Sequence, residues 1–115
     1  MIEEGQIVLI RFPRTDLTQG KLRPAVVIRK LPGPYDDWLI CMISTQIARA
    51  IGGFDEIISA DDPDFGSSGL KTESVVRISR LAIVERRALS GAIGRIHSER
   101  LTRIRKILSD WITEK

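Results

Sequence analysis

The sequence is poor in the residue types that build disulfides and metal sites. Its 115 residues include one cysteine and one histidine. A single cysteine cannot form an internal disulfide, and Cys41 lies in an apolar run, which predicts a buried thiol in a reducing cytosol. One histidine and one cysteine are too few for a zinc site within one chain, so we expect no metal. The acidic cluster Asp61–Asp64 lacks the ligand spacing of an EF-hand loop and is predicted to be a solvated loop.

Further absences narrow the functional class. No apolar run approaches ~20 residues, so no membrane-spanning helix is expected. The acidic first residues, Met1–Gly5, lack the positive start of a signal peptide, which favours a cytoplasmic protein. No glycine-rich phosphate loop follows a strand, so no nucleotide cofactor is expected. His97 lies just before a predicted helix, where a capping or surface position is more ordinary than a place in a catalytic triad.

The composition predicts one globular domain spanning residues 1–115, because 43% of the residues are apolar and 29% are charged. The net charge of +3 is unevenly distributed. Residues 54–73 hold six acidic residues and one lysine, whereas residues 77–106 hold nine basic residues and two glutamates. This asymmetry favours a polyanion or an acidic protein as partner, and an uneven solvated surface is the alternative.

Several short runs rich in β-branched and aromatic residues predict strands. They are Gln6–Phe12, Ala25–Lys30, Trp38–Ile43, Phe54–Ile58 and Ser74–Ile78, with Leu81–Val84 as a further short strand or a turn. Between them, Pro13–Leu22 is predicted to be a loop and Ile47–Gly53 a short link. Ala60–Gly69 is the most loop-like stretch, with no packed element expected. Glu85–Leu89 is compatible with one helical turn.

The C-terminal segment predicts an amphipathic helix over Glu99–Thr113, with Ser98 as its N-cap. Leu101, Ile104, Leu108 and Trp111 recur at helical spacing, and arginines and a lysine occupy the remaining positions. Many short strands followed by one helix indicate a mostly β (α+β) fold, in which a small antiparallel sheet or barrel is capped by the helix.

Arginine and hydroxyl side chains at strand ends are the remaining candidates for a binding site. Arg23 precedes Pro24 at a strand entry, Ser44 and Thr45 end another strand, and Arg77 ends the Ser-Val-Val-Arg run. An arginine fork binds phosphate oxygens and keeps its charge, and hydroxyl groups add neutral donors. Together these residues would form a phosphodiester site without a metal. The alternative is that each arginine merely pairs with a carboxylate.

The same residues carry a resemblance to a known family. The Gly5-Gln-Ile-Val-Leu-Ile run, the polar loop and Arg23-Pro-Ala-Val-Val-Ile resemble the N-terminal signature of the MazF/PemK (Kid-like) toxins. Leu39–Ile47, Gly69–Arg77 and Leu89–Ile96 are similar to later segments of the family, in the same order. The ordered set covers nearly the whole chain, although each motif alone is short.

The resemblance implies a small SH3-like or CcdB-like antiparallel β-barrel with a C-terminal helix, a homodimer, and an acidic antitoxin protein as partner. It also implies metal-independent cleavage of single-stranded RNA, in which a 2′-hydroxyl attacks the adjacent phosphate. On the residues that match, Arg23, Ser44 or Thr45, and Arg77 are the implied catalytic residues. We interpret Arg14, Lys21, Gln46 and Arg80 as contacts to neighbouring nucleotides.

The chain also departs from the family pattern. Kid-like members carry an acidic residue two places after the second arginine, where this chain has Ser79, and their first-loop histidine has no counterpart. The residues that exchange protons with RNA are therefore not assigned. The alternative function is a non-catalytic toxin of the same fold that binds a protein such as DNA gyrase, in which Trp111 near the chain end would matter most. An inactive or regulatory family member is a third possibility.

Overall fold

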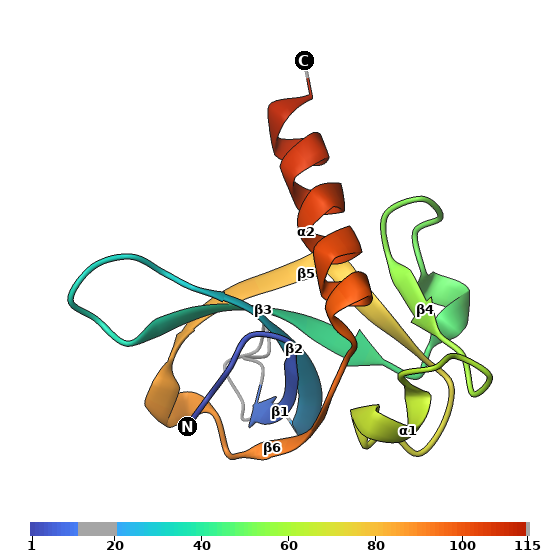
Figure 1. The fold of residues 1–115 in the computed structure, drawn as a ribbon, viewed down its shortest axis with the longest axis horizontal. Helices are drawn as coiled ribbons and strands as arrows, with labels where there is room; N and C mark the ends of the chain where they lie inside the picture. Colours follow the sequence, from blue (N-terminus) through green and yellow to red (C-terminus); the bar gives the residue numbers. More distant parts are fainter. Residues whose placement is uncertain (12–20, 115) are drawn as a thin grey trace.

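The structure is a computed structural model of the chain, and it describes residues 1–11 and 21–114. In this part of the chain, six antiparallel strands form one sheet in the order β4-β5-β3-β2-β1-β6. Figure 1 shows the sheet curled into a half-barrel with the C-terminal helix across it. The strands are β1 Gln6–Arg11, β2 Leu22–Lys30, β3 Asp37–Ser44, β4 Glu56–Ile58, β5 Ser74–Glu85 and β6 Ala92–Arg95. The helices are α1 Phe65–Ser68 and α2 Ser98–Thr113, with 3-10 turns η1 Ile47–Arg49 and η2 Arg86–Ala88. The mostly β fold with a terminal helix is confirmed.

The sheet buries apolar side chains on both of its faces. One face packs against α2 through Leu101, Ile104 and Leu108. The other face is covered by the chain start and by the segment that holds Leu89. The first cluster of buried side chains includes Ile7, Val26, Ile28, Cys41, Ile43, Val76 and Ile78, and the second includes Val8, Ile10, Ala25, Val27, Trp38 and Ile40. Alternate residues of each strand therefore contribute to opposite layers, which is why β2 reads as a continuous apolar run.

The strand boundaries differ from the prediction at β2 and at β5. β2 begins at Leu22, which was assigned to a loop, because its pairing with β1 extends to Leu22. The segments predicted as two strands form one strand, β5, whose pairing with β3 shifts register between Cys41 and Met42. Such a bulge bends a strand without ending it. Phe12 and most of the predicted loop after it lie outside the described residues.

The prediction that residues 60–69 hold no packed element is wrong. The segment forms α1, and Asp64 and Ser68 are buried. Asp64 is therefore part of the interior and not of a solvated loop. The predicted cap is also displaced, since Ser98 is the first residue of α2 and His97 takes the N-cap position without a side-chain hydrogen bond.

The helix α2 follows the predicted stripe only along its first turns. Leu101, Ile104 and Leu108 are buried, but Trp111 is 55% exposed. Figure 1 shows the C-terminal turns of α2 extending beyond the sheet. Arg100, one of the basic residues outside the predicted apolar stripe, is buried. None of the described helices is long and apolar enough to cross a membrane.

The buried Arg100 guanidinium joins α2 to the segment that leads into α1. Its Nε and Nη2 donate to Asp64 at 2.7 and 3.0 Å, and Nη2 also donates to Asp62 at 2.9 Å. Nη1 donates to Glu56 and to the Ile57 carbonyl, both at 3.1 Å. Every nitrogen of the fork therefore has an acceptor, which a buried guanidinium requires.

Two carboxylates of this cluster, Asp62 and Asp64, have lowered pKa values. Burial alone raises the pKa of Asp64, but hydrogen bonds from Arg100 and from the His97 N–H outweigh burial and lower it. A hydrogen bond from the Ser59 N–H, reinforced by Arg100, lowers the pKa of Asp62. For Arg100, burial disfavours the cation, yet its carboxylate partners raise the pKa overall. The cluster is thus ionised at neutral pH.

Cys41 is buried, as predicted, and burial raises the pKa of its thiol to about 12. A thiol with so little thiolate at neutral pH is a poor nucleophile. We therefore assign Cys41 to packing alone.

The cluster predicts a loss of stability in acid. Because the folded pKa of Asp62 and Asp64 lies below the unfolded value of about 3.9, their contribution is fully present above about pH 5. It declines as the pH falls past the unfolded value and is lost as the pH falls through the lower folded values. Asp64→Asn should destabilise the fold by about 3 kcal/mol at pH 7 and flatten this acid dependence. Urea unfolding between neutral and acidic pH measures both effects.

The exposed Asp61 offers a matched control, since Asp61→Asn removes a neighbouring carboxylate outside the cluster. It should unfold with the wild-type stability and acid dependence. Equal acid dependence of Asp64→Asn and wild type would contradict the assignment of acid sensitivity to the Arg100 cluster.

Candidate functional site

The predicted Arg23 and hydroxyl residues line one cavity of about 310 Å³. Most of its lining comes from the beginning of β2, the end of β3 and the segment Gly69–Thr72 after α1, and single residues of β1, β5 and β6 complete it. Its polar lining consists of Arg23, Ser44, Thr45, Lys71, Thr72 and Ser74, and its apolar lining includes Leu9, Leu22, Ile43, Leu70 and Ile93. The cavity thus combines two cations and four hydroxyl groups with an aliphatic wall.

The cavity opens where β2 and β3 separate. β1 pairs with β2 as far as Leu22, but β3 pairs with β2 only as far as the Ala25–Met42 pair. Beyond that pair, β3 continues beside β5 to Ser44. Arg23 and Ser44 each lie two residues beyond the last β2–β3 pair, so they flank the opening. Pro24 fixes the backbone φ directly after Arg23 and restrains that strand entry.

Two glycines hold the third wall against β6. Gly69 ends α1 with a φ of 75°, and a Cβ on it would lie 2.1 Å from the Ile93 carbonyl oxygen. A Cβ on Gly94 would lie 2.3 Å from the Ser67 carbonyl oxygen. Only glycine permits these two backbone approaches. The Leu70 N–H donates to Ser68 Oγ at 3.1 Å, which orders the chain just before Lys71.

The hydroxyl groups of the cavity differ in whether their O–H remains free to donate a hydrogen bond to a ligand. Ser44 Oγ accepts a hydrogen bond from the Gln46 N–H at 3.1 Å, which leaves the Ser44 O–H to donate elsewhere. Ser74 donates its own hydroxyl to the Thr72 carbonyl at 2.9 Å and is therefore committed to the fold. Thr45 is exposed at the end of β3. The Gln46 N–H thus holds the Ser44 hydroxyl, which can donate a hydrogen bond into the cavity that Arg23 and Thr45 also line.

Arg77 does not line this cavity. It lies opposite Met42 on β5, and Met42 in turn lies opposite Ala25, two residues from Arg23 on the same face of the sheet. Arg77 Nε donates to Asp55 at 3.2 Å, and the Asp55 side chain is fully buried. Arg23 and Arg77 therefore share one face of the sheet, but Arg77 is held toward β4.

Asp55 also receives the backbone N–H and the hydroxyl of Ser79, both at 3.1 Å, and the Ile51 N–H at 2.9 Å. Position 79, two places after Arg77, holds a serine, and the carboxylate beside Arg77 is supplied by Asp55 from a distant part of the chain. Sequence spacing gave no signal for it, because Asp55 and Arg77 are 22 residues apart.

The other predicted RNA contacts are dispersed. Lys21 and Arg80 are exposed and do not line the cavity, and Gln46 contributes its backbone N–H to Ser44. Arg14 lies outside the described residues. Lys71 and Thr72 were missed as site residues. The one signal for Lys71 was its place as the single cation in the acidic stretch 54–73.

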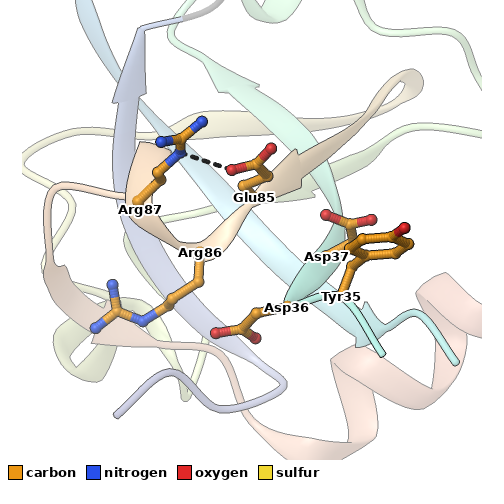
Figure 2. A pocket seen from close by; sticks show the side chains of 6 residues that line it. All are labelled: Tyr35, Asp36, Asp37, Glu85, Arg86 and Arg87. Atoms are coloured by element: carbon orange, nitrogen blue, oxygen red, sulfur yellow. Dashed lines mark ion pairs between the residues drawn. The ribbon is translucent and has the colours of Figure 1, made fainter. Parts of the chain in front are cut away.

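A larger hollow, of about 640 Å³, lies beside the β2–β3 turn (Figure 2). Figure 2 shows Tyr35, Asp36 and Asp37 on one side and Glu85, Arg86 and Arg87 on the other. Its charges largely cancel, since Arg87 Nε pairs with Glu85 at 2.6 Å and two more carboxylates line the hollow. Asp36 also accepts the Trp38 indole N–H at 2.8 Å. An anionic ligand is therefore better matched by the smaller cavity.

An apolar hollow of about 420 Å³ lies between β5 and the exposed end of α2. Trp111 forms one side of it and contacts Phe54 edge to face, with ring centroids 5.9 Å apart. Ile51 and Leu81 complete an exposed apolar surface there. Within residues 1–11 and 21–114, no group of three His, Cys, Asp or Glu side chains is arranged to hold a metal ion.

Comparison with known protein families identifies the family to which this chain belongs. The PemK-like, MazF-like toxins of type II toxin–antitoxin systems match residues 3–112. The chain belongs to this toxin family. A search of curated proteins finds no significant match.

Two solved structures share the fold of this toxin-family chain. One is the Mycobacterium tuberculosis toxin MazF-mt6, with a TM-score of 0.67 and 15% identity over 93% of this chain and 95% of that chain. The other is an endoribonuclease in complex with its cognate antitoxin from a mycobacterial species. Its TM-score is 0.68 and its identity 12%, over 100% of this chain and 98% of that chain. The curled sheet and terminal helix are therefore a shared architecture.

The close packing of the third wall predicts a sensitive glycine. Gly94→Ala should force α1 away from β6, because its Cβ would meet backbone atoms that cannot rotate aside. We expect a loss of about 2 kcal/mol and a fall in Tm of roughly 10 °C, measured by thermal denaturation. Gly52→Ala is the control, since a Cβ there meets nothing within 4 Å. A Tm for Gly94→Ala equal to that of the control would show that the wall is not tightly packed.

Proposed function

We propose that this toxin-family member is a metal-independent endoribonuclease that cleaves single-stranded RNA such as mRNA. The observation that carries the proposal is the cavity in which Arg23 meets Ser44 and Thr45 from a different strand. An arginine fork and hydroxyl donors in one cavity match the oxygens of a phosphodiester. Membership of the family supports this assignment, as does the similar fold of a protein named as an endoribonuclease.

The proposed reaction is an internal displacement on the RNA. The 2′-oxygen of one ribose bonds to the adjacent phosphorus, and the bond from phosphorus to the 5′-oxygen of the next nucleotide breaks. The 2′-hydroxyl loses a proton and the leaving 5′-oxygen gains one, which yields a 2′,3′-cyclic phosphate and a 5′-hydroxyl. No water or external reductant is consumed in this step.

The residues of the cavity have distinct proposed roles in this step. Arg23 neutralises the negative charge that grows on the phosphate oxygens in the transition state. Ser44 donates a hydrogen bond from its hydroxyl to one of these oxygens, and Thr45 helps to position the same phosphate. No carboxylate or histidine is among the described lining residues. A guanidinium group stays protonated in proteins and cannot accept a proton, so Arg23 acts as an electrostatic stabiliser.

Arg77 is the second proposed catalytic cation. Its cross-strand neighbour, Met42, precedes Ser44 by two residues, which places Arg77 about 7 Å along the strand from the hydroxyl pair. With Nε held by Asp55, the terminal nitrogens of Arg77 are left to approach the RNA from the β5 side. Arg14, Lys21, Gln46 and Arg80 stay proposed contacts to the flanking nucleotides.

The proposed partners follow from charge and exposed apolar surface. An antitoxin with an acidic segment would occupy the cations of the cavity and exclude RNA. The exposed apolar side chains of Ile51, Leu81 and Trp111 at the hollow between β5 and α2, with Ile112 next to Trp111 in α2, support association into a homodimer. The proposed site of action, on mRNA, is the cytoplasm.

A second candidate function is inhibition of a protein target such as DNA gyrase without cleavage. The observation that favours it is the hollow beside Trp111, where an exposed tryptophan at the end of α2 could anchor a protein partner. This function would depend on Trp111 and would leave RNA intact.

Mutation of Arg23 tests the nuclease function. In EDTA, wild-type protein should cleave a mixed-sequence single-stranded RNA to fragments with cyclic phosphate and 5′-hydroxyl ends. Arg23→Ala should lower the cleavage rate by about 10²–10³-fold, because it removes a charge aimed at the transition state. Arg23→Lys should restore only part of this rate, because lysine lacks the planar fork. The measurement is single-turnover cleavage followed on gels, with end mapping.

Arg29→Ala is the matched control, because Arg29 is an exposed arginine on the same strand that lies outside the cavity. It should cleave at the wild-type rate. Intact RNA with wild-type protein, together with inhibited DNA supercoiling that Trp111→Ala relieves, would replace the nuclease with the gyrase-type function. Cleavage that survives Arg23→Ala unchanged would exclude this cavity as the active site.

A further inference from the structure

We propose that Lys71 is an RNA-binding residue of this chain and that Gly69–Thr72 is the second wall of the RNA site. The inference rests on the proposed nuclease function and extends it to a residue that the strand-end motifs do not include. Lys71 would bind a backbone phosphate across the cavity from Arg23. The ligand is the sugar–phosphate backbone of single-stranded RNA.

The cations of this chain differ in whether they form ion pairs with carboxylates. Most cations on α2 and its surroundings are neutralised by carboxylates: Arg95 by Glu3, Arg100 by Glu56, Asp62 and Asp64, Arg103 by Glu56, Arg105 by Glu4, and Lys106 by Asp110. Within the described residues, neither Arg23 nor Lys71 forms an ion pair. They come from segments about 50 residues apart, yet they line the same cavity without a carboxylate among its described lining residues. An anion that enters there meets two uncompensated charges.

The backbone that carries Lys71 is held in a fixed position. On its N-terminal side, the chain is held by Gly69 against Ile93 and by the Leu70 N–H to Ser68 bond. On its C-terminal side, Ser74 bonds the Thr72 carbonyl at the start of β5. Ser68 itself is buried. The Lys71 side chain is exposed, but its Cα is anchored on both sides, so its ammonium group stays within reach of the cavity.

The two walls of the cavity carry cations with different binding properties. Arg23 offers a planar fork, which suits the phosphate that reacts, whereas lysine is a compact point charge that accepts any phosphate orientation. A lysine contact to the backbone adds affinity without reading the base. The aliphatic side chains between the walls, Leu9, Leu22, Leu70 and Ile93, can shield one nucleotide from water. Arg23 and Lys71 would therefore bind the RNA backbone on two sides of one nucleotide.

Salt-dependent binding tests the contact. We would measure the anisotropy of a fluorescent 2′-O-methyl oligoribonucleotide, which lacks the attacking hydroxyl, with wild-type protein over a series of KCl concentrations. Lys71→Ala should raise the Kd about tenfold at low salt and reduce the slope of log K against log salt by about 0.7. Lys71→Arg should restore the wild-type slope. Lys71 is exposed, so all variants should keep the wild-type Tm.

The exposed Lys30 at the far end of β2 provides the control, and Lys30→Ala should leave the Kd and slope unchanged. If Lys71→Ala binds the oligonucleotide as Lys30→Ala does, Lys71 is not an RNA contact and the inference is overturned. Cleavage of unmodified RNA by wild-type protein is scored separately. The nuclease function can therefore fail while Lys71 binding is seen, and Lys71 can fail while cleavage is seen.

Discussion

The burial of the Arg100 guanidinium among Glu56, Asp62 and Asp64 is the interaction on which the rest of the structure depends. A buried cation costs several kcal/mol of desolvation, which its acceptors must offset. Here the acceptors come from the segment that leads into α1, so the helix α2 fixes the path of that segment. Since α1 ends at Gly69, the same contacts determine where the Gly69–Thr72 wall stands. A residue of the helix thereby sets the shape of a cavity to which it contributes no atom.

The elements that depend on local pattern were predictable, and those that depend on a single distant charge were not. The strands followed from runs of β-branched residues, and α2 followed from the spacing of Leu101, Ile104 and Leu108. Arg100 gave no local signal, because an arginine beside an apolar stripe is ordinarily solvated. Its burial is decided by carboxylates 36 to 44 residues away. For the same reason, the acidic segment around Asp64 looked like a loop until its partner was known.

In the candidate site, too, residues in local motifs could be predicted and residues placed by distant contacts could not. Arg23 and Ser44 could be predicted because strand ends in an antiparallel sheet bring motif residues together. Lys71 could not, because its place depends on how Gly69 and Gly94 allow two backbones to approach, and no side-chain pattern records that contact. Arg77 lies in a strand, as expected, but the orientation of its side chain depends on Asp55. Sequence reasoning thus located the charges, whereas the three-dimensional packing determines which of them face a common space.

The two kinds of basic residue in this chain have separate physical tasks. Arg100, which meets three carboxylates, has a fixed side chain and contributes little field to an approaching ligand, because its charge is matched nearby. Arg23 and Lys71 lack such partners within the described residues, so their field reaches solvent and is strongest in the cavity that they share. An anionic backbone, the proposed ligand, would then be attracted to this cavity, where the described lining combines uncompensated cations with a concave surface. This explains how a chain with a net charge of only +3 can present a localised polyanion site.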